Sequence, residues 1–215
     1  MLSKEPETIE WLNSLDKGAV LWDIGANVGI YTIYAADAGL DVVAIEPMPS
    51  NYYTLTKNIE VNNLSEKVSA FCFALTNEVC IDFFYISTSQ IGSSQNSFKE
   101  NIGWDYKKME NVDYKHSTIG MSIDSFIKLF SPKFPNYIKI DVDGLEKRII
   151  LGARETLSDP RLKSMLVELN TAWEDYQDIL NFVLGCGFTR WEKKRSEEFD
   201  NGEMKDVYNH IFFKG

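Results

Sequence analysis

The stretch Gly18–Gly29, GAVLWDIGANVG, decides the fold of this chain. Its first half, Ala19–Ile24, is an apolar run of the length of a buried strand, and its second half is a turn punctuated by glycines. A helix over roughly Gly29–Ala38 is predicted to begin directly after the turn. A strand that leads through a glycine-rich turn into a helix N-terminus forms the front of a nucleotide-type site in an α/β sheet.

The segments that follow repeat this alternation. Two further apolar strands, Asp41–Glu46 and Val68–Ala74, are separated by a helix over Ser50–Asn62 that Ser50 can cap. Strands and helices that alternate at these intervals predict a parallel sheet with right-handed crossovers. The length and apolar content fit one domain, so we expect residues 1–215 to form a single α/β unit.

The alternation stops after the third strand. Residues 76–136 form a long insertion before the next buried strand, Tyr137–Asp141. Within it, Ile81–Ile86 and Tyr114–Ser122 predict a β-hairpin, and the polar stretch Ser87–Ser97 predicts a loop. Loops of this length inside compact domains are usually functional lids or disordered. We therefore expect the insertion to cover a substrate site.

The second half of the chain completes the sheet. A strand is predicted over Ser164–Leu169, followed by a helix over Trp173–Leu184. Two strand candidates in the tail, Phe188–Lys193 and Val207–Phe213, are split by a turn at Asn201-Gly202. They predict a closing antiparallel hairpin.

The glycine-rich turn is not a phosphate loop. In the segment Asp23–Gly29, Asn27 stands where the pyrophosphate fingerprint has its second glycine, and the Lys-Ser/Thr pair of a P-loop is absent. The carboxylate of Asp23 would repel a phosphate and favour a cationic group. The amino and sulfonium groups of S-adenosylmethionine (SAM) are cations of this kind.

Glu46 closes the second strand, where an acid can accept hydrogen bonds from both hydroxyls of a ribose. It follows Asp23 at near the spacing of about 20 residues that such units show. Nicotinamide cofactors share the ribose but not this turn, so the pair favours SAM over NAD. Two structural alternatives stay open, in which Asp23 is an anion at a helix N-terminus and Glu46 a solvated strand end.

Three blocks in this order resemble the FkbM family of SAM-dependent methyltransferases. They are VLWDIGANVGIYTIYAA at 20–36, VVAIEPMPSNYYTLTKNIEVNN at 42–63 and YIKIDVDGLEKRIILGA at 137–153. The resemblance spans about Ala19 to Asn170 and implies a Rossmann-like class I methyltransferase fold. That fold has a seven-stranded, mostly parallel sheet with an antiparallel last strand and helices on both faces. The resemblance also implies methyl transfer to oxygen, often on sugars or polyketide-type hydroxyls.

The residues that we expect to contact SAM follow from the turn, the second strand and the resemblance. They are Asp23, Gly25, Ala26, Asn27, Gly29, Glu46, Pro47, Ala74 and Asp141. The chain departs from the family at Asn170, where the family often has His.

Methyl transfer to an alcohol needs a group that removes the hydroxyl proton. The candidates at strand ends are Asp141, Asp143, Glu146 and Glu168, with Asp141 as first choice and Glu146 as the group that orients substrate or the neighbouring loop. Glu146 can instead stabilise a helix N-terminus, and Asp143 can cap it. His116 on the insertion is a further candidate base, with strand packing as the alternative.

A magnesium site is an alternative for the same strand ends. Asp141, Glu168 and Asn170 supply hard oxygen ligands on adjacent strands, which magnesium tolerates. The histidines His116 and His210 are far apart in sequence, which disfavours zinc.

The bulk properties limit the partners. The net charge of −10 argues against a general nucleic-acid binder, and no apolar run approaches the ~20 residues that span a bilayer. Three cysteines without framework spacing and an N-terminus without a signal-peptide pattern predict a cytoplasmic protein. We expect a small-molecule or glycan acceptor. An N-methyltransferase and a catalytically silent SAM-binding module remain as alternatives.

Overall fold

The computed structural model describes residues 5–196, 202 and 204–215. Within these residues the main sheet has seven strands. Their order is β10 (Phe188–Lys194), β11 (Val207–Lys214), β9 (Ser164–Asn170), β8 (Tyr137–Ile140), β1 (Val20–Ile24), β2 (Asp41–Ile45) and β3 (Val68–Phe71). β11 runs antiparallel to both of its neighbours, and the other neighbouring pairs are parallel. This confirms the predicted sheet and its reversed last strand.

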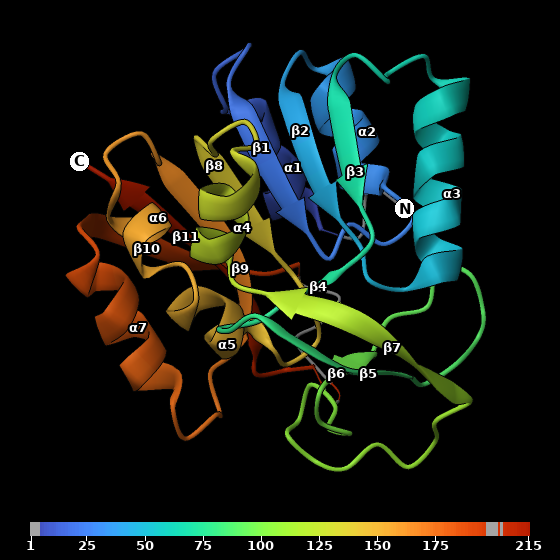
Figure 1. Cartoon of the computed structure of the whole chain (residues 1–215). Coiled ribbons are helices and arrows are strands. Elements are labelled where there is room, and N and C mark those ends of the chain that lie inside the picture. Colours follow the sequence, from blue (N-terminus) through green and yellow to red (C-terminus); the bar gives the residue numbers. More distant parts are fainter. Residues whose placement is uncertain (1–4, 197–201, 203) are drawn as a thin grey trace.

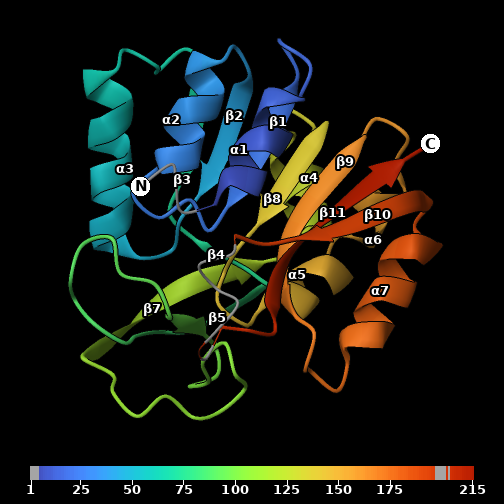
Figure 2. The same ribbon diagram turned by 180° about the vertical axis from the view of Figure 1, so that it is seen from behind.

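Helices cover both faces of this sheet, as Figures 1 and 2 show from opposite sides. One face carries α1 (Pro6–Asn13), α2 (Ile30–Asp37) and α3 (Pro49–Val61), and the other carries α4 (Ile123–Phe130), α5 (Glu146–Leu151), α6 (Arg154–Ser158) and α7 (Tyr176–Gly185). Leu12, Ala35 and Leu55 belong to the core of the first face. Phe126 and Leu180 belong to the core of the second. The central strands β1, β2, β8 and β9 are buried along most of their length because both of their faces are covered.

One predicted helix boundary is corrected by the structure. Met48 rather than Ser50 is the N-cap of α3, because Pro49 occupies the first turn, where its missing N–H costs nothing. The helical segment after β8 is divided into α5 and α6 at Gly152. A Cβ at Gly152 would lie 2.5 Å from the backbone oxygen of Thr76, so the start of the insertion packs directly against this break.

A smaller, four-stranded sheet is built within the described residues. Its order is β4 (Ala74–Leu75), β7 (Tyr114–Met121), β5 (Cys80–Ile86) and β6 (Ser97–Phe98). The antiparallel pair of β5 and β7 is the hairpin predicted from the sequence. The predicted third strand was too long, because β3 ends at Phe71 and Ala74 pairs in the smaller sheet instead.

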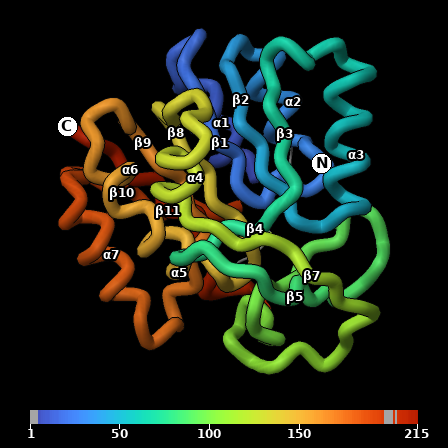
Figure 3. The backbone as a smooth tube through the Cα atoms, viewed as in Figure 1, coloured from blue at the N-terminus to red at the C-terminus, as the bar shows by residue number. Residues whose placement is uncertain are grey.

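The smaller sheet lies at the carboxyl ends of β1, β2 and β3 (Figure 1). Met48, Phe84, Phe98 and Leu145 form a buried cluster between it and the rest of the chain. The tube in Figure 3 shows the loops of the insertion at the same end of the molecule. The insertion is therefore packed onto the edge of the main sheet where α/β folds bind ligands.

The tail forms the predicted antiparallel hairpin of β10 and β11. β11 also pairs with β9 along seven residues of each strand, from Val207 opposite Asn170 to Phe213 opposite Ser164. Asn201, half of the turn predicted between these strands, lies outside the described residues.

Candidate functional site

A cavity of about 530 Å³ opens at the carboxyl ends of the central strands. Its walls come from the turn after β1, the end of β2, the loop 92–96 of the insertion, and the ends of β8 and β9. The strand order reverses between β1 and β8, and ligands of open α/β sheets bind at such switch points. The volume lies within the range of about 300–1,000 Å³ that small-molecule sites occupy.

The residues placed in the cavity wall include seven of the nine expected cofactor contacts. These are Gly25, Ala26, Asn27, Glu46, Pro47, Ala74 and Asp141. Asp23 and Gly29 are the two that lie elsewhere.

Gly25 makes the turn after β1 possible. Its φ is +79°, and a Cβ there would lie 1.9 Å from the backbone oxygen of Asp141. The N–H groups of Gly25 and Ala26 both donate to the backbone oxygen of Ile45, at 3.0 and 3.1 Å. The turn thus packs against the end of β8 and is hydrogen-bonded to the end of β2. A ligand can approach its backbone closely because no side chain intervenes at Gly25.

Glu46 fixes the backbone around the cavity. Its Oε2 accepts a hydrogen bond from the N–H of Asn27, and its Oε1 accepts one from the N–H of Met48, both at 2.8 Å. Burial raises the pKa of Glu46 to about 7, which these two hydrogen bonds partly oppose. Each carboxylate oxygen can accept more than one hydrogen bond, so both remain able to accept ribose hydroxyls.

Asn27 connects the turn to the insertion. It adopts a left-handed conformation with φ of 51°, which asparagine tolerates better than most residues. Its Nδ2 donates to the backbone oxygen of Ser93 at 3.2 Å. Asn51 at the start of α3 holds the same loop, with its Nδ2 donating to the Ser93 oxygen at 3.1 Å and its Oδ1 accepting from the N–H of Gly92 at 2.8 Å. The sequence analysis missed Asn51, although a buried amide in an amphipathic helix is an available signal.

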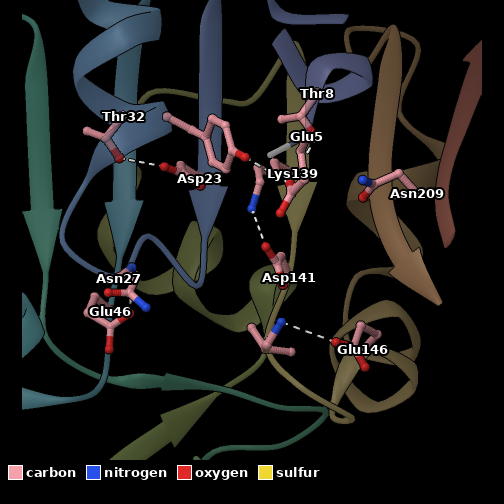
Figure 4. Close-up of polar contacts among 12 residues, drawn as sticks. Glu5, Thr8, Asp23, Asn27, Thr32, Glu46, Lys139, Asp141, Glu146 and Asn209 are labelled. Carbon is pink, nitrogen blue, oxygen red and sulfur yellow. Dashed lines mark hydrogen bonds and ion pairs between the residues drawn. The ribbon is translucent and has the colours of Figure 1, made fainter. Parts of the chain in front are cut away.

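Asp23 does not contact the cavity, so its predicted role as a direct partner of a cationic ligand is corrected. Its side chain is buried beneath the turn, and its Oδ2 accepts a hydrogen bond from the Thr32 hydroxyl at 2.5 Å (Figure 4). Burial raises the pKa of Asp23, and the charge of Lys139 partly opposes this rise. Asp23 therefore joins β1 to α2, and its charge interacts with that of Lys139.

Gly29 is also a structural residue rather than a direct contact. It is the N-cap of α2 with φ of 89°, and a Cβ there would lie 2.4 Å from Cδ1 of Leu55. The glycine allows α2 and α3 to pack closely beside the turn.

Lys139 is the main cavity residue that sequence analysis missed. It is fully buried in β8, and its Nζ donates to Oδ2 of Asp141 at 2.9 Å (Figure 4). The same Nζ lies 5.0 Å from the centre of the Tyr31 ring. Burial acts to lower the pKa of Lys139, but Asp141, Asp23 and Glu5 outweigh it and hold the pKa above its ordinary value. A lysine inside the otherwise apolar strand was the available signal.

Glu146 holds the loop after β8. Its Oε1 accepts from the N–H of Val142 at 3.1 Å, and both of its carboxylate oxygens accept from the N–H of Gly144. Burial raises the pKa of Glu146 to about 8. Of the roles expected for it, this geometry fits the orientation of the neighbouring loop. Glu146 lines a small recess beside the main cavity rather than the cavity itself.

His116 lies outside the cavity wall, so the structure gives no support for its use as a base. It is a half-buried residue of β7, and its ring contacts the rings of Phe84 and Tyr114. The alternative of strand packing fits this position.

Two of the three residues of the magnesium alternative, Asp141 and Asn170, are engaged in other contacts. Oδ2 of Asp141 is paired with Lys139, and Oδ1 of Asn170 accepts from the N–H of Ala172 at 2.9 Å. Among the described residues, no group of three or more His, Cys, Asp and Glu side chains is arranged to hold a metal ion. With two of its three donors already bound, this set does not fit a magnesium site.

Comparison with known proteins identifies the family. The model of the methyltransferase FkbM domain matches residues 23–190. The chain belongs to the FkbM family. This confirms the family resemblance and the class of SAM-dependent methyltransferases that it implies. No curated protein matches the chain. No helix in the described part of the chain is both long and apolar enough to cross a membrane.

Solved structures share the fold at low sequence identity. A methyltransferase FkbM from Methylobacillus flagellatus KT is 16% identical with a TM-score of 0.58, and the match covers 91% of this chain and 43% of that one. The chain thus spans less than half of that protein's length. A precorrin-6y C5,15-methyltransferase from Geobacter metallireducens GS-15 is 15% identical with a TM-score of 0.54, covering 98% and 87% of the two chains. TrmK of M. capricolum in complex with S-adenosylhomocysteine (SAH) is 11% identical with a TM-score of 0.53, covering 97% and 68%.

Proposed function

We propose that this FkbM-family chain transfers the methyl group of SAM to a hydroxyl of a sugar, glycan precursor or small metabolite. The observation that carries the proposal is the position of Glu46. Its carboxylate stands in the cavity wall beside the Gly25 turn, at the switch point of the sheet. A carboxylate at the end of the second strand is suited to a ribose diol, and the close backbone at Gly25 is suited to a nucleoside-type ligand.

The charges of the cavity support SAM in particular. Glu5, Asp141, Asp143 and Glu168 contribute carboxylates to the wall, against the one buried ammonium of Lys139 within the described residues. A wall with this excess of acids favours a ligand with a positive charge at its centre. SAM supplies an activated methyl group on a sulfonium, and SAH is the ligand of the similar TrmK structure.

Oxygen as the acceptor atom is supported by the same wall. An alcohol needs a nearby group that takes its proton, and carboxylates at the ends of β8 and β9 meet this need. The indole of Trp104 also lines the cavity and can stack on the face of a sugar ring. The net charge of −10 favours an acceptor other than nucleic acid.

Loop 92–96 supports the proposed role of the insertion as a substrate lid. It lines the cavity and is tied to Asn27 and Asn51 by hydrogen bonds rather than by a large apolar contact.

A cytoplasmic location is part of the proposal as well. The three free cysteines Cys72, Cys80 and Cys186 support a reducing compartment.

Ligand-induced stabilisation tests the cofactor. At a SAH concentration of 100 Kd, we expect a stabilisation of about 2.7 kcal/mol, which raises the Tm by about 5–10 °C. NAD at the same concentration should leave the Tm unchanged. Stabilisation by NAD and none by SAH would contradict the proposal.

The acceptor atom is tested with matched pairs of alcohols and amines, such as methyl glucoside against methyl glucosaminide. SAH formation and the mass of the product would show which atom gains the methyl group. We expect a methyl ether. Methylation of the amine alone would favour the N-methyltransferase. Tight SAM binding without any product would favour the silent module.

A further inference from the structure

The carboxylates around the cavity differ in what already binds them. Asp141 is paired with Lys139, Glu46 accepts two backbone N–H groups, and Oδ2 of Asp143 accepts from the N–H of Gln95 at 2.6 Å. Glu168 has no hydrogen bond or ion pair with any described residue. It is thus the cavity carboxylate whose oxygen atoms are left for a ligand.

The position of Glu168 suits the acceptor rather than the cofactor. It stands near the end of β9, and β8 separates this strand from β1 and its turn. Neighbouring strands are ~4.8 Å apart, so the Gly25 turn and Glu168 lie about 10 Å apart across the cavity. This span leaves room for a reacting centre between them.

A second recess continues from Glu168 away from the cofactor turn. Glu168 lines it together with Trp104, Trp173 and Val207, and both Glu168 and Trp104 also line the main cavity. Nε1 of Trp173 donates to the backbone oxygen of Trp104 at 3.1 Å, which joins the insertion to the segment after β9. Glu168 therefore lies at the junction between the main cavity and the recess that Trp104 and Trp173 line.

The charged groups that act on Glu168 come from several elements. Asp141 and Asp143 lie after β8, Glu146 begins α5, and Glu5 precedes α1. Across the strand pair, its partner on β11 is the neutral Asn209. Burial and then these four carboxylates raise the pKa of Glu168 well above its ordinary value, which makes the ionised carboxylate a stronger base.

We propose that Glu168 is the catalytic base that takes the proton of the acceptor hydroxyl. This inference rests on the proposed function. The hydroxyl oxygen bonds to the methyl carbon while the carbon–sulfur bond breaks, and the electron pair of that bond goes to sulfur. SAM becomes the neutral thioether SAH, and the hydroxyl proton goes to Glu168. Asp141, the first choice from sequence, becomes a positioning group held by Lys139.

The test compares the wild type, Glu168→Gln and the control Glu155→Gln, in which an exposed carboxylate of α6 changes to the same amide. Turnover is followed as SAH formation from SAM, with a panel of methyl glycosides and polyols as acceptors. We expect Glu168→Gln to lower kcat by about 10²–10⁴-fold. Its Kd for SAH should stay within about twofold of the wild type. The wild-type rate should rise with pH as Glu168 ionises, and the variant should lose this rise.

A second measurement needs no acceptor. Calorimetry in buffers of different ionisation enthalpy counts the protons released on binding SAM and SAH. The sulfonium of SAM favours the ionised form of a carboxylate beside it, so the wild type should release more protons with SAM than with SAH. This difference should become smaller in Glu168→Gln, in which only other cavity carboxylates such as Glu46 can respond, and should stay unchanged in Glu155→Gln.

The outcomes separate the two proposals. Full turnover with an unchanged pH profile in Glu168→Gln, or an unchanged proton release, would overturn the base assignment and leave the methyltransferase proposal standing. A wild type that binds SAM and methylates no hydroxyl of the panel would overturn the proposed function, and the base assignment would fall with it.

Discussion

The two sides of the cavity are built in different ways. On the cofactor side, side-chain to backbone hydrogen bonds join neighbouring segments of the first β–α–β unit, as those of Glu46 with Asn27 and Met48 do. On the acceptor side, Trp104 and Glu168 are far apart in sequence and meet only because the insertion packs against β9. The cofactor side thus has its centre within the first β–α–β unit, although Gly25 also packs against Asp141, whereas the acceptor side depends on contacts between distant segments.

The largest expected effect is on the cofactor side. Gly25→Ala places a Cβ 1.9 Å from the backbone oxygen of Asp141, so the turn must move. We expect SAH binding to become undetectable by calorimetry, with a loss of about 3 kcal/mol in unfolding free energy. The matched control is Gly187→Ala, which has a φ of +94° but open space around the new Cβ. It should cost about 1 kcal/mol of stability and leave SAH binding intact. Equal losses of SAH affinity and of stability in the two variants would show that the close contact between Gly25 and Asp141 is not what sets the cofactor side.

The next largest effect is the loss of SAH affinity expected when Glu46 is replaced. In Glu46→Gln, the amide NH₂ faces one of the two backbone N–H groups that the carboxylate now binds. We expect the Kd for SAH to rise by about 10–100-fold, equivalent to about 1.4–2.8 kcal/mol. Calorimetry with Glu155→Gln as control checks this. A change below twofold would show that Glu46 holds neither the turn nor the ribose.

A smaller and different effect is expected at Trp104. Because this side chain lines the acceptor side, Trp104→Ala should raise the acceptor KM by about tenfold, equivalent to about 1.4 kcal/mol. The Kd for SAH should not change. Steady-state kinetics and calorimetry separate the two constants, with Trp191→Ala on the distant β10 as control. A weaker SAH affinity with an unchanged KM would place Trp104 on the cofactor side instead.

The smallest effect is on the pH dependence of stability. The pKa values of Glu46 and Glu146 are raised to about 7 and about 8, so the folded state binds protons more tightly than the unfolded state. Their contribution to stability is full below the unfolded pKa and is lost as pH rises through 7 to 8. The Tm without ligand should therefore fall between pH 5 and pH 8.5, by about 5 °C.

Glu146→Gln tests the source of this slope. Differential scanning calorimetry should show a flatter decline of Tm with pH in the variant than in the wild type. An identical slope in both proteins would assign the pH dependence to other groups.

Sequence patterns predicted the main sheet well because its central strands are largely apolar runs bounded by turn residues. The same patterns failed to predict features that depend on contacts between distant segments. The third strand was predicted to reach Ala74, but pairing with Gly120 moves that residue into the smaller sheet. Asp23 was identified as important, but only the packing of α2 shows that Thr32 binds its carboxylate beneath the turn.

The sequence by itself determined the family, the order of the seven strands' segments and the turn that holds the backbone around Gly25. These depend on residue type and spacing over short distances, which a sequence displays directly. Only the tertiary structure decided which carboxylates are already bound and which one is left for a ligand. Lys139 engages Asp141, while Glu168 stands between the cavity and the aromatic recess. The physical reason is that hydrogen bonding and burial depend on neighbours from distant segments, and these meet only when the sheet is assembled.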